Sequence, residues 1–365
     1  MLKKSLLALS VLAASGTTMA QSSVTLYGIA DVFLGSVTSN NGTTSVTKTV
    51  LDSGNVSVSR WGMMGTEDLG GGLKANFNLE NGFSMDTGAV ANSGVLFGRQ
   101  AWVGLSSGLG AVRLGRTNTA YYEVETNDVP IFNAYLSPEV QIFRSSHGLP
   151  DKFGASTKNN TYVSPSSNTL RYDSPSLSGF NAIASYSLDE KAPLDTTFNR
   201  DIPNGVSVAA LALRYAGGPV IVSLGYQNEA KYNPPTNTSD RNFTRLQGQY
   251  SFGSFIARAG YGKAGNIANK TSADATEYVL GLDYKATDVL TLAAAYARSG
   301  DNAVESATVT GGTGDVSRTG YGLAAKYTLS KRTFLYGGYE SDTQSKTGLN
   351  DAHHSLFALG MQHRF

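Results

Sequence analysis

The chain has 365 residues, and its 29 lysines and arginines nearly balance its 28 aspartates and glutamates. This balance excludes the basic excess of a nucleic-acid-binding protein, so no nucleic-acid partner is predicted. The absence of cysteine excludes a disulfide framework and a thiolate metal site. Tyrosine (19) and glycine (41) are frequent, and these residues favour strands and tight turns respectively.

The first twenty residues have the pattern of a secretory signal peptide. Two lysines precede the apolar run 6–14, and small residues surround Ala20. A charged region, a short apolar region and a small-residue cleavage site are typical of an export signal, and the apolar run is too short to span a membrane. We therefore predict a signal peptide at residues 1–20 and a single exported domain at residues 21–365.

The exported domain alternates apolar and polar residues with a period of two, which predicts strands. The residues between the apolar ones are mostly glycine, charged or amide side chains. The clearest apolar rows are Val24/Leu26/Val32/Leu34, Val220/Val222/Leu224/Tyr226, Tyr278/Leu280/Leu282/Tyr284, Tyr321/Leu323/Ala325/Tyr327 and Phe357/Leu359/Met361/Phe365.

The connections between these strands alternate in length. Short turns fall near 68–71, 107–109, 175–178, 216–219, 252–253, 286–288 and 330–331, and long polar connections near 36–55, 86–94, 117–166, 189–205, 229–241, 265–275, 299–318 and 341–354. Seven turns and eight loops join sixteen strands, and an even number of antiparallel strands with this asymmetry is typical of outer-membrane barrels. We predict an all-β, sixteen-stranded antiparallel transmembrane β-barrel with short periplasmic turns, long extracellular loops and an aqueous lumen.

The connection at 117–166 is much longer than the others. A link of this length inside a compact domain is either functional or a sign of a wrong assignment. We predict that this third loop folds back into the lumen and narrows it.

Several short motifs carry a resemblance to a known family. The chain resembles the general trimeric porins of Gram-negative outer membranes, of the β-proteobacterial type, over the whole exported domain. The motifs are Ser23-Val24-Thr25-Leu26-Tyr27-Gly28, Ser59-Arg60-Trp61-Gly62, Gly72-Leu73-Lys74-Ala75, Arg99-Gln100-Ala101-Trp102-Val103-Gly104-Leu105, Leu170-Arg171-Tyr172-Asp173-Ser174-Pro175 and the closing His363-Arg364-Phe365.

The resemblance implies a constriction in which basic wall residues face acids on the third loop. The matching basic residues are Arg60, Arg99 and Arg171, and Lys74 also has inward parity. The loop acids are Glu123, Glu125, Asp128 and Glu139, in a loop without the Pro-Glu-Phe-Gly core of enterobacterial relatives. Opposed charges across a narrow opening create a transverse field, and an excess of arginine favours anions. The alternative is that the arginines only pair with carboxylates in a wide lumen.

The implied function is a general porin: a water-filled channel for passive diffusion of ions and small hydrophilic solutes across the Gram-negative outer membrane, with a weak preference for anions. The resemblance also implies a homotrimer in contact with outer-membrane lipids and lipopolysaccharide. It further implies recognition of the terminal Phe365 by the barrel-assembly machinery.

The sequence offers little support for a catalytic site. The four histidines, at 147, 353, 354 and 363, match no catalytic spacing. We therefore predict no enzyme activity, no metal and no cofactor. The remaining alternatives are an outer-membrane barrel enzyme (a lipase or protease) and an adhesin or phage receptor that acts through its loops.

Overall fold

The computed structural model describes residues 23–91, 95–126, 130–146, 164–188, 207–230, 239–267, 271–272, 274–302 and 311–365. The predicted signal peptide and Asp128 lie outside the described residues. Most of the described chain is strand. The strands are β1 (Ser23–Asn40), β2 (Ser45–Ser53), β3 (Arg60–Gly70), β4 (Leu73–Gly82), β5 (Gln100–Ser107), β6 (Gly110–Thr117), β7 (Ser166–Asp173), β8 (Phe180–Ser187), β9 (Val208–Gly217), β10 (Val220–Glu229), β11 (Arg241–Phe252), β12 (Phe255–Gly265), β13 (Ala275–Lys285), β14 (Leu290–Asn302), β15 (Thr313–Thr328), β16 (Thr333–Thr347) and β17 (Ala352–Arg364).

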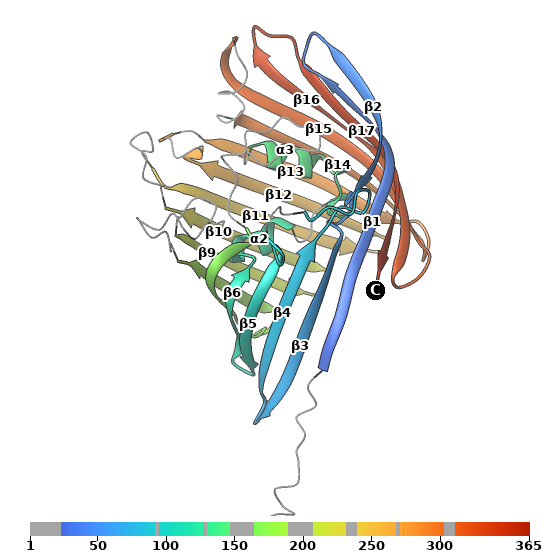
Figure 1. Cartoon of the computed structure of the whole chain (residues 1–365). Coiled ribbons are helices and arrows are strands. Elements are labelled where there is room, and N and C mark those ends of the chain that lie inside the picture. The colour runs from blue at the N-terminus through green and yellow to red at the C-terminus, as the bar shows by residue number, and fades with distance from the viewer. Residues whose placement is uncertain are drawn as a thin grey trace, which may run out of the picture.

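The strands form one closed antiparallel barrel (Figure 1). From β3 onward each strand pairs with the next, and β17 pairs with β1 to close the ring. One edge of β1 pairs with β3 over its first half and with β2 over its second half, so β2 and β3 share one place in the ring. The seventeen strand segments therefore make a sixteen-stranded barrel, which confirms the predicted fold class.

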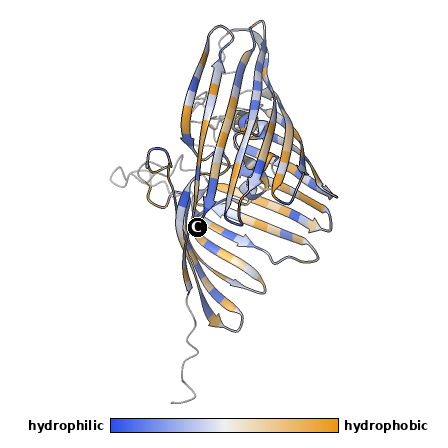
Figure 2. Cartoon of the chain, turned by 90° about the vertical axis from the view of Figure 1, so that its right-hand side faces the viewer, coloured by the Kyte–Doolittle hydropathy of each residue, from blue (hydrophilic) through white to orange (hydrophobic). Residues whose placement is uncertain are grey.

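The apolar rows face outward along the whole barrel. Leu26, Leu280 and Leu323 are 62%, 59% and 59% exposed, whereas the residues between them point into the lumen. Figure 2 shows the resulting alternation of hydrophobic and hydrophilic residues along the strands. Exposed leucine and tyrosine in such numbers require an apolar surrounding, and an apolar outer band with a polar interior is the arrangement of a membrane barrel.

The last residue completes the barrel at the short-turn end. The Gly28 N–H donates to the Phe365 carbonyl at 3.0 Å, and the Phe365 N–H donates to the Gly28 carbonyl at 3.1 Å. A Cβ on Gly28 would lie 2.2 Å from the Phe365 ring. Glycine therefore leaves the space that the terminal aromatic ring covers on the neighbouring strand.

Two connections expected to be long loops are mostly strand. β1 continues to Asn40 and β2 begins at Ser45, while β16 ends at Thr347 and β17 begins at Ala352. Threonine and valine are frequent in these extensions and favour strands, so pairing continues beyond the membrane band. Figure 1 shows β1, β2, β16 and β17 as the tall side of the barrel.

The connection between β6 and β7, here called L3, folds into the barrel. It contains α2 (Ala120–Thr126), the 3₁₀ turn η1 (Ile131–Asn133) and α3 (Pro138–Ser146). α2 packs on β8–β11 and α3 on β13–β16, both inside the ring (Figure 1). Within the described part of the chain, no helix has the length and the apolar character needed to cross a membrane.

Inward glycines and alanines make room for L3. A Cβ on Gly225 would lie 3.1 Å from Val124, and one on Gly281 would lie 2.5 Å from the Pro130 ring. A Cβ on Gly322 would lie 2.3 Å from the Leu136 carbonyl oxygen. Alanines of β9 and β14, and Ala324 of β15, pack on the same buried loop residues. Small residues at these positions therefore leave the volume that the loop fills.

The buried carboxylate of Asp31 on β1 holds the connection between β2 and β3 against the inner face of the barrel. Asp31 accepts hydrogen bonds from Tyr336 (2.7 Å), Gln362 (2.9 Å) and the backbone N–H groups of Asn55 and Ser57 (3.1 Å each). These last two residues lie between β2 and β3, where the chain crosses from one to the other. The Asn55 carbonyl in turn accepts from the Tyr135 N–H at 3.0 Å, so this segment also contacts L3.

Candidate pore constriction

Arg60 and Arg99 share one carboxylate on the lumen wall. Arg99 Nε donates to Glu80 Oε1 at 2.7 Å, and Arg60 Nη1 lies 3.9 Å from the same oxygen. The Tyr27 hydroxyl donates to Glu80 Oε2 at 2.9 Å. Glu80 stands on β4 between Arg60 at the start of β3 and Arg99 just before β5. Two guanidinium groups and one carboxylate leave one net positive charge at this place.

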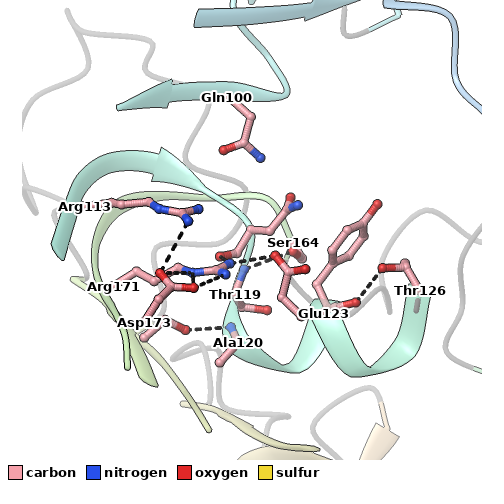
Figure 3. Close-up of polar contacts among 12 residues, drawn as sticks. Gln100, Arg113, Thr119, Ala120, Glu123, Thr126, Ser164, Arg171 and Asp173 are labelled. Carbon is pink, nitrogen blue, oxygen red and sulfur yellow. Dashed lines mark hydrogen bonds and ion pairs between the residues drawn. The ribbon is translucent and has the colours of Figure 1, made fainter. Parts of the chain in front are cut away.

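Arg171 on β7 binds Glu123 of α2. Its Nη1 donates to Glu123 Oε1 at 2.8 Å and its Nη2 to Asp173 Oδ1 at 2.7 Å (Figure 3). Arg113 Nη2 lies 3.6 Å from the other Asp173 oxygen. Arg171 is only 3% exposed. Two arginines and two carboxylates make this cluster electrically balanced, and it fastens α2 to β7.

Glu139 lies in the first turn of α3 and forms an ion pair with Arg245 of β11. Both side chains are buried, so this pair also fastens L3 to the wall. Glu125 lies near Tyr121 on α2, and burial raises the pKa of the Tyr121 phenol well above its usual value. The phenol therefore stays neutral in the packed interface between α2 and the wall.

Lys74 does not reach the cluster of Arg60, Glu80 and Arg99. It is exposed at the short-turn end of β4, six residues before Glu80. Because a strand rises about 3.3 Å per residue, the two side chains are separated by roughly 20 Å along the barrel. Asp128 lies outside the described residues.

The structure thus places two of the predicted loop acids, Glu123 and Glu139, directly against wall arginines. Among the described residues, Arg60 and Arg99 form their ion pairs with Glu80 and not with either of these two carboxylates. The partner arginine of Glu139 and the pair Arg113–Asp173 were missed by sequence reasoning. The inward parity of β6 and β11, given by Leu114 and Leu246 on the opposite face, was the signal that would have found the two arginines. The described residues contain no group of three or more His, Asp or Glu side chains arranged to hold a metal ion.

The fold and the site together define a class of protein. A closed barrel with a lipid-compatible outside, a charged lumen and an inward loop is a membrane channel whose bore is limited by that loop. Short turns at one end and longer connections at the other are typical of barrels in outer membranes.

Comparison with known proteins identifies the family. The family model for Gram-negative porins matches residues 6–347. The chain is 32% identical to an outer membrane porin protein of Bordetella pertussis over the full length of both proteins. It is 36% identical to Outer membrane porin protein 32 of Delftia acidovorans over 69% of this chain and 67% of that protein. The chain belongs to the Gram-negative porin family.

A solved structure agrees with this assignment. The anion-selective porin from Comamonas acidovorans superposes with a TM-score of 0.74 and 26% sequence identity, covering 94% of this chain and all of that one. The protein is a general porin of the Gram-negative outer membrane and forms a water-filled channel for passive diffusion of ions and small hydrophilic solutes. The alternatives of a barrel enzyme (a lipase or protease) and of an adhesin or phage receptor acting through its loops are not favoured.

Proposed function

We propose that this channel prefers small anions, because Arg60 and Arg99 share the single carboxylate of Glu80. The neighbouring cluster of Arg113, Arg171, Asp173 and Glu123 is electrically balanced, whereas the cluster at Glu80 keeps one positive charge. A positive charge in a narrow lumen with low-dielectric walls raises the local concentration of anions and lowers that of cations. The similar porin from Comamonas acidovorans is described as anion-selective, which supports the same preference here.

The reversal potential of the purified protein in a planar bilayer, measured under a KCl gradient, tests this proposal. The double variant Arg60→Gln/Arg99→Gln leaves the Glu80 carboxylate unpaired by arginine and is expected to move the reversal potential toward that of a cation-selective pore. Glu80→Gln leaves both arginines and is expected to increase anion preference. Lys331→Gln/Arg332→Gln, which removes two positive charges from an exposed turn, is the matched control for the double variant. Equal reversal potentials in all four proteins would contradict the proposal.

The proposal includes the assembly of three copies. An outer membrane protein of Vibrio cholerae, whose solved structure is described as a trimer form, shares this fold at 16% identity. The exposed apolar rows of the barrel provide surface for both subunit contacts and outer-membrane lipids, including lipopolysaccharide. Cross-linking in membranes tests the assembly: a ladder ending at three copies supports it, and monomer alone contradicts it.

We also assign the terminal aromatic residue to recognition by the barrel-assembly machinery. Phe365 is 48% exposed beside Gly28, at the end of the strand that closes the ring. Phe365→Ser is expected to reduce the amount of folded protein in the outer membrane while the same variant still refolds in detergent. Unchanged membrane levels would argue against this role. We propose no catalytic activity for the protein.

A further inference from the structure

The lumen wall formed by β3–β6 contains a pocket that lies apart from the Arg60–Glu80–Arg99 cluster, toward the short turns. Its volume is about 270 Å³, and its inward lining includes Met64, Thr66, Asn76, Asn78, Trp102 and Arg113. Asn78 lies two residues beyond Glu80 toward the turn, so a solute passing the constriction meets this pocket next. The described helices of L3 have their main contacts with β8–β11 and β13–β16, away from this part of the wall.

Two glycines create the space. Asn78, Trp102 and Gly115 lie side by side in register across β4, β5 and β6, and Asn76, Gly104 and Arg113 form the next row. Gly115 has a φ of +133°, a conformation that favours glycine, and a Cβ there would lie 2.3 Å from the Ala101 carbonyl oxygen. Glycine therefore leaves one position in each row without a side chain: Gly115 next to the Trp102 indole, and Gly104 next to the Arg113 guanidinium.

The pocket has one aromatic and one cationic side. The Trp102 Nε1–H donates to Gln100 Oε1 at 2.9 Å, which fixes the orientation of the indole. The Arg113 guanidinium lies 4.9 Å from the indole centroid, and Asp173 holds it at 3.6 Å. A guanidinium stacked on an aromatic ring keeps its edge available for a planar anion such as a carboxylate or a phosphate.

The remaining lining is neutral and rich in hydrogen-bonding groups. Thr66 Oγ1 donates to Asn76 Oδ1 at 3.0 Å, and Asn76 Nδ2 donates to Ser106 Oγ at 2.9 Å. Asn78 lies 2.9 Å from the Tyr27 hydroxyl, whose single hydrogen is donated to Glu80, so the Asn78 amide donates one N–H to this hydroxyl. Among the described residues no other protein group binds this amide, so its second N–H and its oxygen are available to a solute in the lumen.

We propose that this pocket is a weak binding site for a monosaccharide that carries a carboxylate or a phosphate. The indole offers an apolar surface to the C–H face of a sugar ring, the amides bind its hydroxyls, and Arg113 binds the anionic group. The volume lies just below the range of about 300–1,000 Å³ that drug-sized ligands occupy, which matches a single sugar ring. The site requires an open lumen, as the channel function does, but not the anion preference at Arg60 and Arg99.

The chain contains only two tryptophans, and this makes the site directly observable. Trp102 lines the lumen, whereas Trp61 has outward parity opposite Gly28 and packs edge-on against Phe97 at 6.3 Å. In the Trp61→Phe variant, all tryptophan fluorescence reports on the pocket. We expect galacturonate and glucose 6-phosphate to change this fluorescence saturably, and Trp102→Phe, which keeps only Trp61, to show no change.

Matched probes and variants distinguish binding of the anionic group from binding of the sugar hydroxyls. Glucose is expected to act only at much higher concentration, and KCl or inorganic phosphate to have no saturable effect. In the Trp61→Phe background, Arg113→Gln is expected to weaken galacturonate binding about tenfold, as for loss of a charged hydrogen bond. Asn78→Leu is expected to weaken binding of both glucose and galacturonate, and Arg332→Gln on an exposed turn is expected to change neither.

Two results would overturn this inference. An equal response to inorganic phosphate and galacturonate would show a site for anions in general rather than for anionic sugars. No response to any sugar, in a protein that conducts ions with the expected reversal potential, would remove the site and leave the proposed anion preference intact.

Discussion

Two parts of the lumen wall differ in the side chains that they present. The docking wall, formed by the inward faces of β8–β16, carries glycine and alanine where L3 packs closest, beside buried charged residues such as Arg245. The arginine wall, formed by β3–β7, presents long polar and aromatic side chains such as Arg60, Trp102 and Arg171. Both walls have the same apolar outward rows, because both face lipid.

The difference shows that the inward face of a wide barrel is shaped by what it contacts. Where a loop fills the lumen, small residues bury apolar loop side chains such as Tyr121 and Leu136. Where water remains, charged and amide groups stay hydrated or pair with each other. The bore is thus determined on one side by packing and on the other side by charge.

The largest effect is expected from a bulky side chain on the docking wall, in the space that L3 occupies. In Gly322→Leu the new side chain overlaps the Leu136 carbonyl and displaces L3, so we expect a loss of about 3 kcal/mol of stability from overpacking. Single-channel conductance should rise, and liposomes should swell in a trisaccharide that the native channel excludes. Ala325→Leu, on the lipid side of the same strand, should change neither quantity.

Removal of the Asp31 charge should have the next largest effect. In Asp31→Asn one of the acceptor oxygens becomes a donor that faces the existing donors, so we expect a loss of about 1–3 kcal/mol. Urea unfolding of the protein in lipid vesicles measures this change. Because the segment held by Asp31 contacts L3, conductance should also become noisier. Asp288→Asn, on an exposed turn, provides the comparison, and equal unfolding midpoints would contradict the prediction.

Neutralising Glu123, which joins L3 to the arginine wall, tests how the net charge of the lumen sets the ion preference. In Glu123→Gln, Arg113 and Arg171 are left with Asp173 as their shared carboxylate, so one positive charge is added to the lumen. The reversal potential in a KCl gradient should move toward stronger anion preference. Glu67→Gln, an exposed acid on β3, should leave it unchanged. A shift toward cations would show that Glu123 does not neutralise the wall.

The smallest expected effect is on the salt dependence of the native channel. The Debye length falls from about 10 Å at 0.1 M salt to about 3 Å at 1 M, so the charge near Glu80 is increasingly screened. The ratio of anion to cation permeability should therefore decrease between these concentrations. Conductance that grows with salt at a constant permeability ratio would instead point to selection by size alone.

Much of the fold could be predicted from periodicity. The outward rows through Leu280 and Leu323 and the positions of the turns follow from local sequence, because lipid imposes a period of two on every strand. The connections at 36–55 and 341–354 are shorter in the structure than the sequence predicted. Strand pairing outside the membrane depends on a neighbouring strand of equal length, which local sequence does not reveal. Contact between β1 and β17, which are far apart in sequence, allowed both to extend.

The sequence by itself determined the barrel, its strand number, its two faces and the inward direction of Arg60 and Arg171, because these follow from the number of connections and from alternation along each strand. Only the tertiary structure decided which charges pair. Glu123 meets Arg171, Glu139 meets Arg245, and Glu80 is shared by Arg60 and Arg99, since these partners come from separate strands and from a loop whose path depends on the glycines beneath it. The remaining charge, and with it the expected selectivity, follows from those long-range contacts.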